Sequence, residues 1–162
     1  MTKFKGDATL VTLAEARLWL GQRIRKKGAD CPCCDRYAKA YNRKLNAGMA
    51  VSLIRLYRLG PPGDWVHLTK RLLEERKNAV AQEYSKLRFW SLAESYEGAD
   101  KTKRSSGYWR ITDTGVQFVL GQVRVPRKVV VYGNQLVSWS SEATTIKEAL
   151  GDKFDYDELM SG

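Results

Sequence analysis

The chain has 162 residues, 43% of them apolar and 10% aromatic, which is enough to bury the core of one domain and excludes global disorder. Its net charge of +10 is uneven: residues 1–60 carry 13 Lys and Arg against 4 Asp and Glu, whereas residues 111–162 carry 5 against 7. This asymmetry favours a polyanionic partner, nucleic acid before an acidic protein surface. No apolar run approaches the roughly 18 residues of a membrane-spanning helix, and the N-terminus lacks a signal-peptide core, so we expect no membrane partner and a cytoplasmic location.

The first predicted helix follows Thr12. The residues TLAE form a capping-box pattern, in which Thr12 caps the helix start and Glu15 reaches back to it. Apolar residues then recur at helical spacing over residues 13–27, and Gly28 is placed to end the helix.

Three cysteines follow within four positions. Their odd number and close spacing make a poor disulfide framework, and in a reducing compartment they indicate metal binding or redox chemistry. Cys31 and Cys34 form a CxxC pair, which can place two thiolates on one tetrahedral zinc. The best structural zinc site combines Cys31, Cys34 and His67, with Cys33 or Asp35 as the fourth ligand. Plain reduced thiols and a redox pair are the alternatives.

Residues 36–46 are basic and aromatic, and the pattern allows either a helix or an extended segment. Asn46 is predicted to cap a helix over residues 47–59. After a Gly- and Pro-rich turn, residues 65–68 are predicted to form a short strand and residues 69–76 a short helix.

The stretch from residue 78 to residue 121 follows the order helix, strand, polar tip, strand, helix. We predict a helix over residues 79–89, strands over 92–96 and 108–111, and a last helix over 114–120 capped by Asp113. This is the order of a winged helix-turn-helix, in which a recognition helix precedes a β-hairpin wing.

Residues 125–139 are predicted to form a second hairpin around the turn at Gly133 and Asn134. A short helix is expected over residues 145–150. The acidic residues of the tail, 152–158, are better explained as solvating a terminal helix than as a two-metal site.

The segment KLRFWSLAES…SSGYWRITDTGVQFVL resembles the winged-helix core of MarR-type proteins, over residues 46–121. In that pattern a leucine pair links the recognition helix to the first wing strand, and the second strand ends in Leu/Ile-Thr-x-x-Gly. Leu87, Leu92, Ile111, Thr112 and Gly115 hold these places. The residues CPCCDRYAKAYNRKLN and KFDYDELM also resemble those of small phage proteins, a likeness that implies no activity.

The winged-helix interpretation assigns DNA contacts to the recognition helix, its start and the wing tip. Glutamine and arginine can read adenine and guanine edges, and cations at the helix start and wing tip can contact phosphates. The assigned residues are Lys77, Asn78, Gln82, Ser85, Lys86, Arg88, Lys101, Lys103 and Arg104. Trp65, Trp90, Tyr108 and Trp109 could alternatively stack on single-stranded bases, although core or wing packing explains them more simply.

We therefore expect an α+β fold, a winged helix-turn-helix with a basic N-terminal helical extension, an extra C-terminal β-hairpin and a short C-terminal helix. The expected segments are residues 1–45, 46–121 and 122–162. The expected function is non-catalytic binding of double-stranded DNA, as a phage regulator in the host cytoplasm. The alternative is an inhibitor or adaptor that binds a host protein through its basic surface. The sequence leaves the oligomeric state open between a monomer and a homodimer. A single histidine and the absence of phosphate-loop, HExxH and nucleophile-elbow motifs argue against an enzyme.

Overall fold

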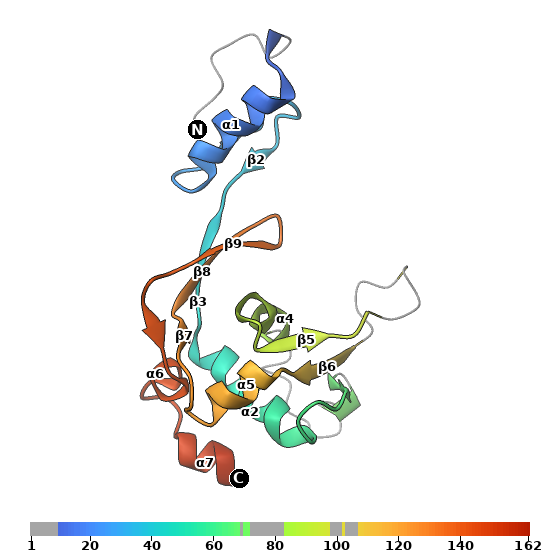
Figure 1. Ribbon diagram of the computed structural model, residues 1–162, viewed down its shortest axis with the longest axis vertical. Helices are drawn as coiled ribbons and strands as arrows, with labels where there is room; N and C mark the ends of the chain where they lie inside the picture. The colour runs from blue at the N-terminus through green and yellow to red at the C-terminus, as the bar shows by residue number, and fades with distance from the viewer. Residues whose placement is uncertain (1–9, 69, 72–82, 98–101, 103–106) are drawn as a thin grey trace. The chain divides into compact units, whose positions relative to one another are not determined.

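The computed structural model is an α+β fold with antiparallel sheets, which confirms the predicted class (Figure 1). The chain divides into a smaller unit, Met1–Arg43 with Val130–Ser138, and a larger unit, Lys44–Val129 with Trp139–Gly162. Among the described residues no helix is long and apolar enough to cross a membrane. The structure describes residues 10–68, 70–71, 83–97, 102 and 107–162.

In the smaller unit, helix α1 (Leu13–Ile24) begins where its sequence predicts. The Glu15 N–H donates to the Thr12 hydroxyl at 3.2 Å, and the Thr12 N–H donates to the Glu15 carboxylate at 2.9 Å, which completes the capping box. Beyond the helix, Gly28 has φ +81°, and a Cβ there would overlap the Tyr37 hydroxyl. Only glycine fits this position without strain.

Residues 36–46 are extended rather than helical. Strands β1 (Ala29–Asp30) and β2 (Tyr37–Ala38) pair antiparallel around the cysteine turn, and β3 (Tyr41–Lys44) follows. β3 is held in a sheet of order β3-β8-β9, so a remote strand decides its conformation.

The predicted second hairpin is present as β8 (Lys128–Tyr132) and β9 (Gln135–Trp139). Its two turn residues, Gly133 and Asn134, have φ values of 55° and 63°. Two successive positive φ angles belong to a type I′ turn, whose twist matches that of the flanking strands.

Helix α2 (Ala47–Leu59) is buried on nearly every side in the larger unit. The Asn46 side chain accepts the Met49 N–H at 2.9 Å, as the predicted cap requires. α2 packs against α4 (Tyr84–Leu87), α5 (Asp113–Val119), α6 (Ile146–Leu150) and α7 (Tyr156–Ser161). Its buried residues are Met49, Ala50, Val51, Ser52, Leu53, Ile54 and Leu56.

A three-stranded sheet is formed by one strand before α4 and two strands after the short 3-10 helix η2 (Arg88–Trp90). Its strands are β4 (Val66–His67), β5 (Ala93–Ser95) and β6 (Tyr108–Ile111), in the order β4-β6-β5 (Figure 1). Both pairings are antiparallel, which confirms the short strand and the two hairpin strands predicted from the sequence.

The loop before α5 locks this helix onto the start of β5. The prediction that Asp113 caps α5 is wrong, because Thr112 is the N-cap and its hydroxyl accepts the Gly115 N–H at 3.0 Å. The Thr112 N–H in turn donates to the Leu92 carbonyl at 3.1 Å. A Cβ on Gly115 would overlap that same carbonyl oxygen, so the Thr-x-x-Gly pattern has a local structural reason.

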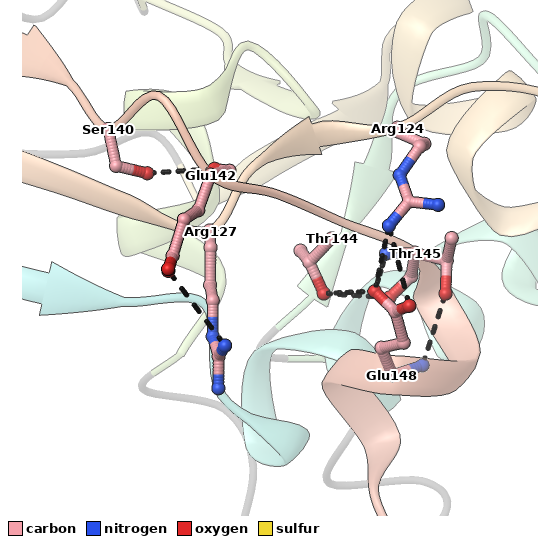
Figure 2. Close-up of polar contacts among 7 residues, drawn as sticks. All are labelled: Arg124, Arg127, Ser140, Glu142, Thr144, Thr145 and Glu148. Atoms are coloured by element: carbon pink, nitrogen blue, oxygen red, sulfur yellow. Dashed lines mark hydrogen bonds and ion pairs between the residues drawn. The ribbon is translucent and has the colours of Figure 1, made fainter.

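The C-terminal segment is fixed to the larger unit by a small polar network. β7 (Val125–Pro126) pairs with β10 (Ala143–Thr144), and α6 begins directly after it. Arg124 and Thr144 point at the Glu148 carboxylate at 3.4 and 3.3 Å, while the Glu148 N–H donates to the Thr145 hydroxyl at 3.2 Å (Figure 2). The tail then forms a second short helix, α7, after the predicted helix that begins at Thr145.

Replacing Gly115 by alanine is expected to destabilise the protein by about 2 kcal/mol or more, because the added methyl has no space beside the Leu92 carbonyl. Chemical denaturation measures the change. Gly21→Ala is the matched control: nothing lies within 4 Å of its Cβ position in α1, and a gain of up to about 1 kcal/mol is expected there. Equal effects at the two positions would contradict the packing argument.

The free energy of unfolding should depend on pH through the Glu148 carboxyl. The Thr145 backbone N–H, followed by the Arg124 charge, holds the pKa of this carboxyl below its ordinary value. A lowered folded-state pKa stabilises the fold above the unfolded pKa, and this stabilisation is lost as pH falls through the folded pKa. Urea unfolding from pH 7 to pH 3 should therefore show Glu148→Gln less stable than wild type at neutral pH, with the difference shrinking in acid. A stability difference between Glu148→Gln and wild type that does not change with pH would contradict the lowered pKa of Glu148.

Candidate nucleic-acid interface and cysteine turn

The described part of the predicted recognition helix has the expected inward and outward sides. Tyr84 and Leu87 are 1% and 0% exposed, whereas Ser85 and Arg88 face solvent and Lys86 is half-buried. The inward set continues into Trp90, which is also buried. Ser85 and Arg88, three residues apart, therefore lie on an accessible side.

The cations of this segment are already engaged by neighbours. The Lys86 ammonium lies 2.9 Å from the Glu83 carboxylate, so much of its charge is offset locally. The Arg88 guanidinium lies 4.9 Å from the centre of the Phe89 ring, which positions it against an apolar surface. Both cations thus have neighbours within this segment, and Arg88 is the more exposed of the two.

The other predicted DNA-binding residues lie outside the described residues. They are Lys77, Asn78, Gln82, Lys101, Lys103 and Arg104.

The sheet β4-β6-β5 has one apolar face and one aromatic, charged face. Val66 is opposite Trp109 and Ala93 is opposite Ile111, so alternation assigns neighbouring positions to opposite faces. The core face is formed by Val66, Leu68, Ala93 and Ile111, which are all buried. The opposite face, called here the aromatic sheet face, is formed by Trp65, His67, Glu94, Tyr96, Tyr108 and Arg110.

Arg110 lies at the centre of the aromatic sheet face. Its guanidinium is 4.5 Å from the Trp65 ring and forms an ion pair with Glu94. The Trp65 ring also meets Tyr96 edge-on, with centroids 5.2 Å apart. Trp65 and Tyr96 remain 37% and 49% exposed, so they offer ring surface to a partner.

The aromatic residues that the sequence analysis considered for base stacking differ in burial. Trp90 is a core residue, 3% exposed, and its indole N–H donates to the Pro126 carbonyl at 2.6 Å. Tyr108 is exposed and Trp109 is half-buried. Tyr96 and Arg110 are not among the residues predicted from the sequence, although strict alternation along residues 94–96 and 108–110 places both on the solvent side.

His67 is packed within the larger unit. Its ring meets Tyr108 edge-on at 4.7 Å, and its Nδ1 accepts the Lys70 N–H at 3.3 Å. Gly107 lies against the same ring, so a Cβ there would stand 3.0 Å from Nε2. Local packing thus accounts for the ring's orientation.

The three cysteines occupy the turn between β1 and β2 in the smaller unit. The Cys31 N–H donates to the Arg36 carbonyl at 2.8 Å, and the Asp35 N–H donates to the Cys31 carbonyl at 2.9 Å. Asp35 adopts the left-handed conformation, φ 59°, which closes the turn. Cys31 is half-buried, while Cys33 and Cys34 are exposed, and all three are free thiols.

The Cys31 sulfur is the focus of this turn. Hydrogen bonds from the backbone N–H of Cys33, and then of Cys34, lower the pKa of the Cys31 thiol, and both neighbouring thiols are within hydrogen-bonding reach. Partial desolvation of the otherwise exposed Cys33, with the Cys31 charge next, raises the pKa of Cys33. The turn therefore favours a thiolate at Cys31.

Within the part of the chain that the structure describes, no group of three or more His, Cys, Asp or Glu side chains is arranged to hold a metal ion. No protein-family model matches the chain, and neither a curated protein nor a solved structure matches it significantly.

In reduced, metal-free protein near pH 7, iodoacetamide should alkylate Cys31 faster than Cys33, because the thiolate is the nucleophile. Timed mass spectrometry of peptides measures the two rates. Urea-unfolded protein is the control, in which the two rates should converge. Faster labelling of Cys33 in the folded protein would contradict the inferred thiolate position.

Proposed function

We propose that residues 46–121 form a winged helix-turn-helix core that binds double-stranded DNA, in a non-catalytic regulator of phage origin acting in the host cytoplasm. The observation that carries the proposal is the sheet order β4-β6-β5 together with the order of elements along the chain. A short strand before the candidate recognition helix joins a hairpin that comes directly after it.

This topology supports a wing because the three strands tie the hairpin to the helical core. β5 closely follows η2, and α5 packs on α2. The Thr112 N–H, at the start of α5, donates to the Leu92 carbonyl just before β5. The hairpin therefore projects from a fixed base. A wing held in this way can reach the DNA backbone beside a groove occupied by the helix.

The charge and chemistry of the exposed residues are consistent with the proposal. Arg88 can make bidentate contacts to guanine, and Ser85 can donate to bases or phosphates. Lys101, Lys103 and Arg104, predicted at the wing tip, add cations for phosphate contacts. Phosphate neutralisation of this kind makes binding fall steeply with salt.

A second function is favoured by the aromatic sheet face. Arg110 is neutralised by Glu94, while the Trp65 and Tyr96 rings stay exposed. Exposed aromatic residues around a paired arginine are typical of protein contacts, where tryptophan, tyrosine and arginine carry much of the binding energy. The alternative proposal is therefore an inhibitor or adaptor that binds a host protein.

Duplex binding should be measured by fluorescence anisotropy across a salt series. Wild type is expected to bind a random duplex, with log affinity falling linearly against log salt. Replacing Lys101, Lys103 and Arg104 together should reduce that slope by up to about 3, roughly one for each phosphate that the wing tip no longer neutralises. On a selected specific site, Arg88→Ala should weaken binding roughly tenfold or more.

Lys153→Ala is the matched control, because it removes an exposed cation from the same unit between α6 and α7. It should leave the salt slope and the stability unchanged. Absence of duplex binding at low salt by folded wild type would reject the DNA proposal. Co-purification of one host protein, abolished in Trp65→Ala, would then support the alternative.

A further inference from the structure

An extended segment of the smaller unit, residues 36–43, carries aromatic and basic side chains in alternation. Ala38 and Ala40 are buried, so the odd-numbered positions around them lie on the other side of the segment. These positions, called here the tyrosine–cation row, are Tyr37, Lys39, Tyr41 and Arg43. Ring and charge alternate over roughly 20 Å, because positions on one side of an extended chain recur about every 6.6 Å.

The tyrosine–cation row lines a hollow of about 500 Å³ that lies within the smaller unit. Arg36 adds a third cation to this hollow, and Tyr132, the last residue of β8, adds a third tyrosine. Tyr37 and Tyr41 are 48% and 54% exposed, so their rings offer surface to a ligand. The hollow can therefore receive flat groups and anionic groups side by side.

The positive charge of the hollow is not offset by neighbouring carboxylates. No aspartate or glutamate is among the described residues that line it, and Asp35, beside Arg36 in the cysteine turn, lies outside the lining. Between described residues none of the three cations forms an ion pair, in contrast to Lys86 and Arg110. The described residues of this unit carry 8 Lys and Arg against 3 Asp and Glu. The hollow therefore favours an anionic ligand.

The tyrosine–cation row is held in place by contacts of its own unit. The Ala40 N–H donates to the Ile24 carbonyl at 2.7 Å, at the end of α1, and the Tyr37 hydroxyl donates to the Lys27 carbonyl. Strand β3 then continues the segment into the sheet β3-β8-β9. Because these contacts exist in the free protein, a ligand meets rings and cations that are already arranged, which lowers the entropic cost of binding.

Alternating rings and cations suit a polymer in which flat bases alternate with phosphates. Proteins that bind single strands combine a positive groove for the backbone with aromatic side chains on which bases stack. The Lys39 ammonium lies 6.0 Å from the centre of the Tyr41 ring, so a phosphate at the cation adjoins a base at the ring. In a duplex, neighbouring base pairs cover the base faces, so the hollow favours an unpaired strand. An acidic protein segment can pair with the cations, but it gives the rings no role.

We propose that the tyrosine–cation row binds single-stranded DNA. Tyr41 stacks on a base, while Lys39 and Arg43 contact the phosphates on either side of it. The site is separate from the winged-helix core and goes beyond the duplex binding proposed for that core. Only the choice of deoxyribose rests on the proposed function, because DNA is the polymer proposed for the larger unit.

Fluorescence anisotropy of the full chain with a labelled oligo(dT) of about 10 nucleotides, a length typical of single-strand sites, tests the proposal. Log affinity should fall against log salt with a slope of about −2, from about 0.7 for each of the three cations. Tyr41→Ala should weaken binding roughly tenfold without changing this slope, and Tyr41→Phe should retain the affinity. Lys39→Gln and Arg43→Gln should each reduce the slope by about 0.7.

Arg17→Gln is the matched control, because it removes an exposed cation of α1 that does not line the hollow. It should change the affinity for oligo(dT) much less than Lys39→Gln does, and circular dichroism checks that each variant is folded. The loss caused by Tyr41→Ala should persist when the three wing-tip cations are also replaced, whereas Tyr41→Ala alone should leave duplex binding unchanged. The single-strand and duplex proposals therefore fail separately.

Three results would overturn the proposal. Equal binding of an abasic strand of the same length would show that charge acts alone and that no base stacks on the tyrosines. Tighter binding of oligo(U) than of oligo(dT) would assign the tyrosine–cation row to RNA. Absence of oligo(dT) binding at low salt by folded wild type would exclude a DNA strand and favour an acidic protein segment.

Discussion

The larger unit depends on the burial of helix α2. Seven of its residues, from Met49 to Leu56, are inaccessible or nearly so, and four other helices pack around it. Each fully buried leucine or isoleucine contributes about 1.5–3 kcal/mol, so this one helix supplies a large share of the hydrophobic stabilisation. The buried Ser52 hydroxyl donates to the Gly48 carbonyl of the same helix at 2.7 Å, so this polar group is satisfied inside the core. Because α4 and α5 rest on α2, the position of the candidate DNA-binding side chains follows from this packing.

The sequence predicted best those features that a few neighbouring residues decide. The caps at Thr12 and Asn46 and the turn at Gly133 and Asn134 are of this kind, and all three are confirmed. Residues 36–46 stayed ambiguous because their extended state comes from pairing with β8, more than eighty positions away. Alternation along β5 and β6 places Tyr96 and Arg110 on the solvent side, but their contacts with Trp65 depend on the pairing of β4 with β6, which joins segments far apart in the sequence. Of the candidate DNA-binding residues, Ser85 and Arg88 were correctly placed on the exposed side, because helical spacing alone separates them from Tyr84 and Leu87.

Net charge gives an incomplete account of the surface that a polyanion would meet. Two of the cations nearest the candidate interface, Lys86 and Arg110, are each paired with a glutamate. Partly exposed surface pairs of this type are worth between zero and about 1 kcal/mol, so a phosphate can displace the glutamate at little cost. The pairing orients the cations in the free protein. It also lowers non-specific attraction, and a sequence-dependent contact such as that proposed for Arg88 then matters more for selectivity.

Among the described helices of the larger unit, α7 is attached in a distinct way. It has no buried residue, and it is held through main-chain oxygen atoms: the Tyr156 hydroxyl donates to the Val119 carbonyl at 2.7 Å, and Arg58 donates to the Leu159 carbonyl at 3.0 Å. Its departure would expose little apolar surface and leave the core intact, so α7 belongs to the low-energy end of local unfolding. Separation of α7 from the helix beneath it would thus break chiefly these two hydrogen bonds, and the buried side chains of α2 would stay in place.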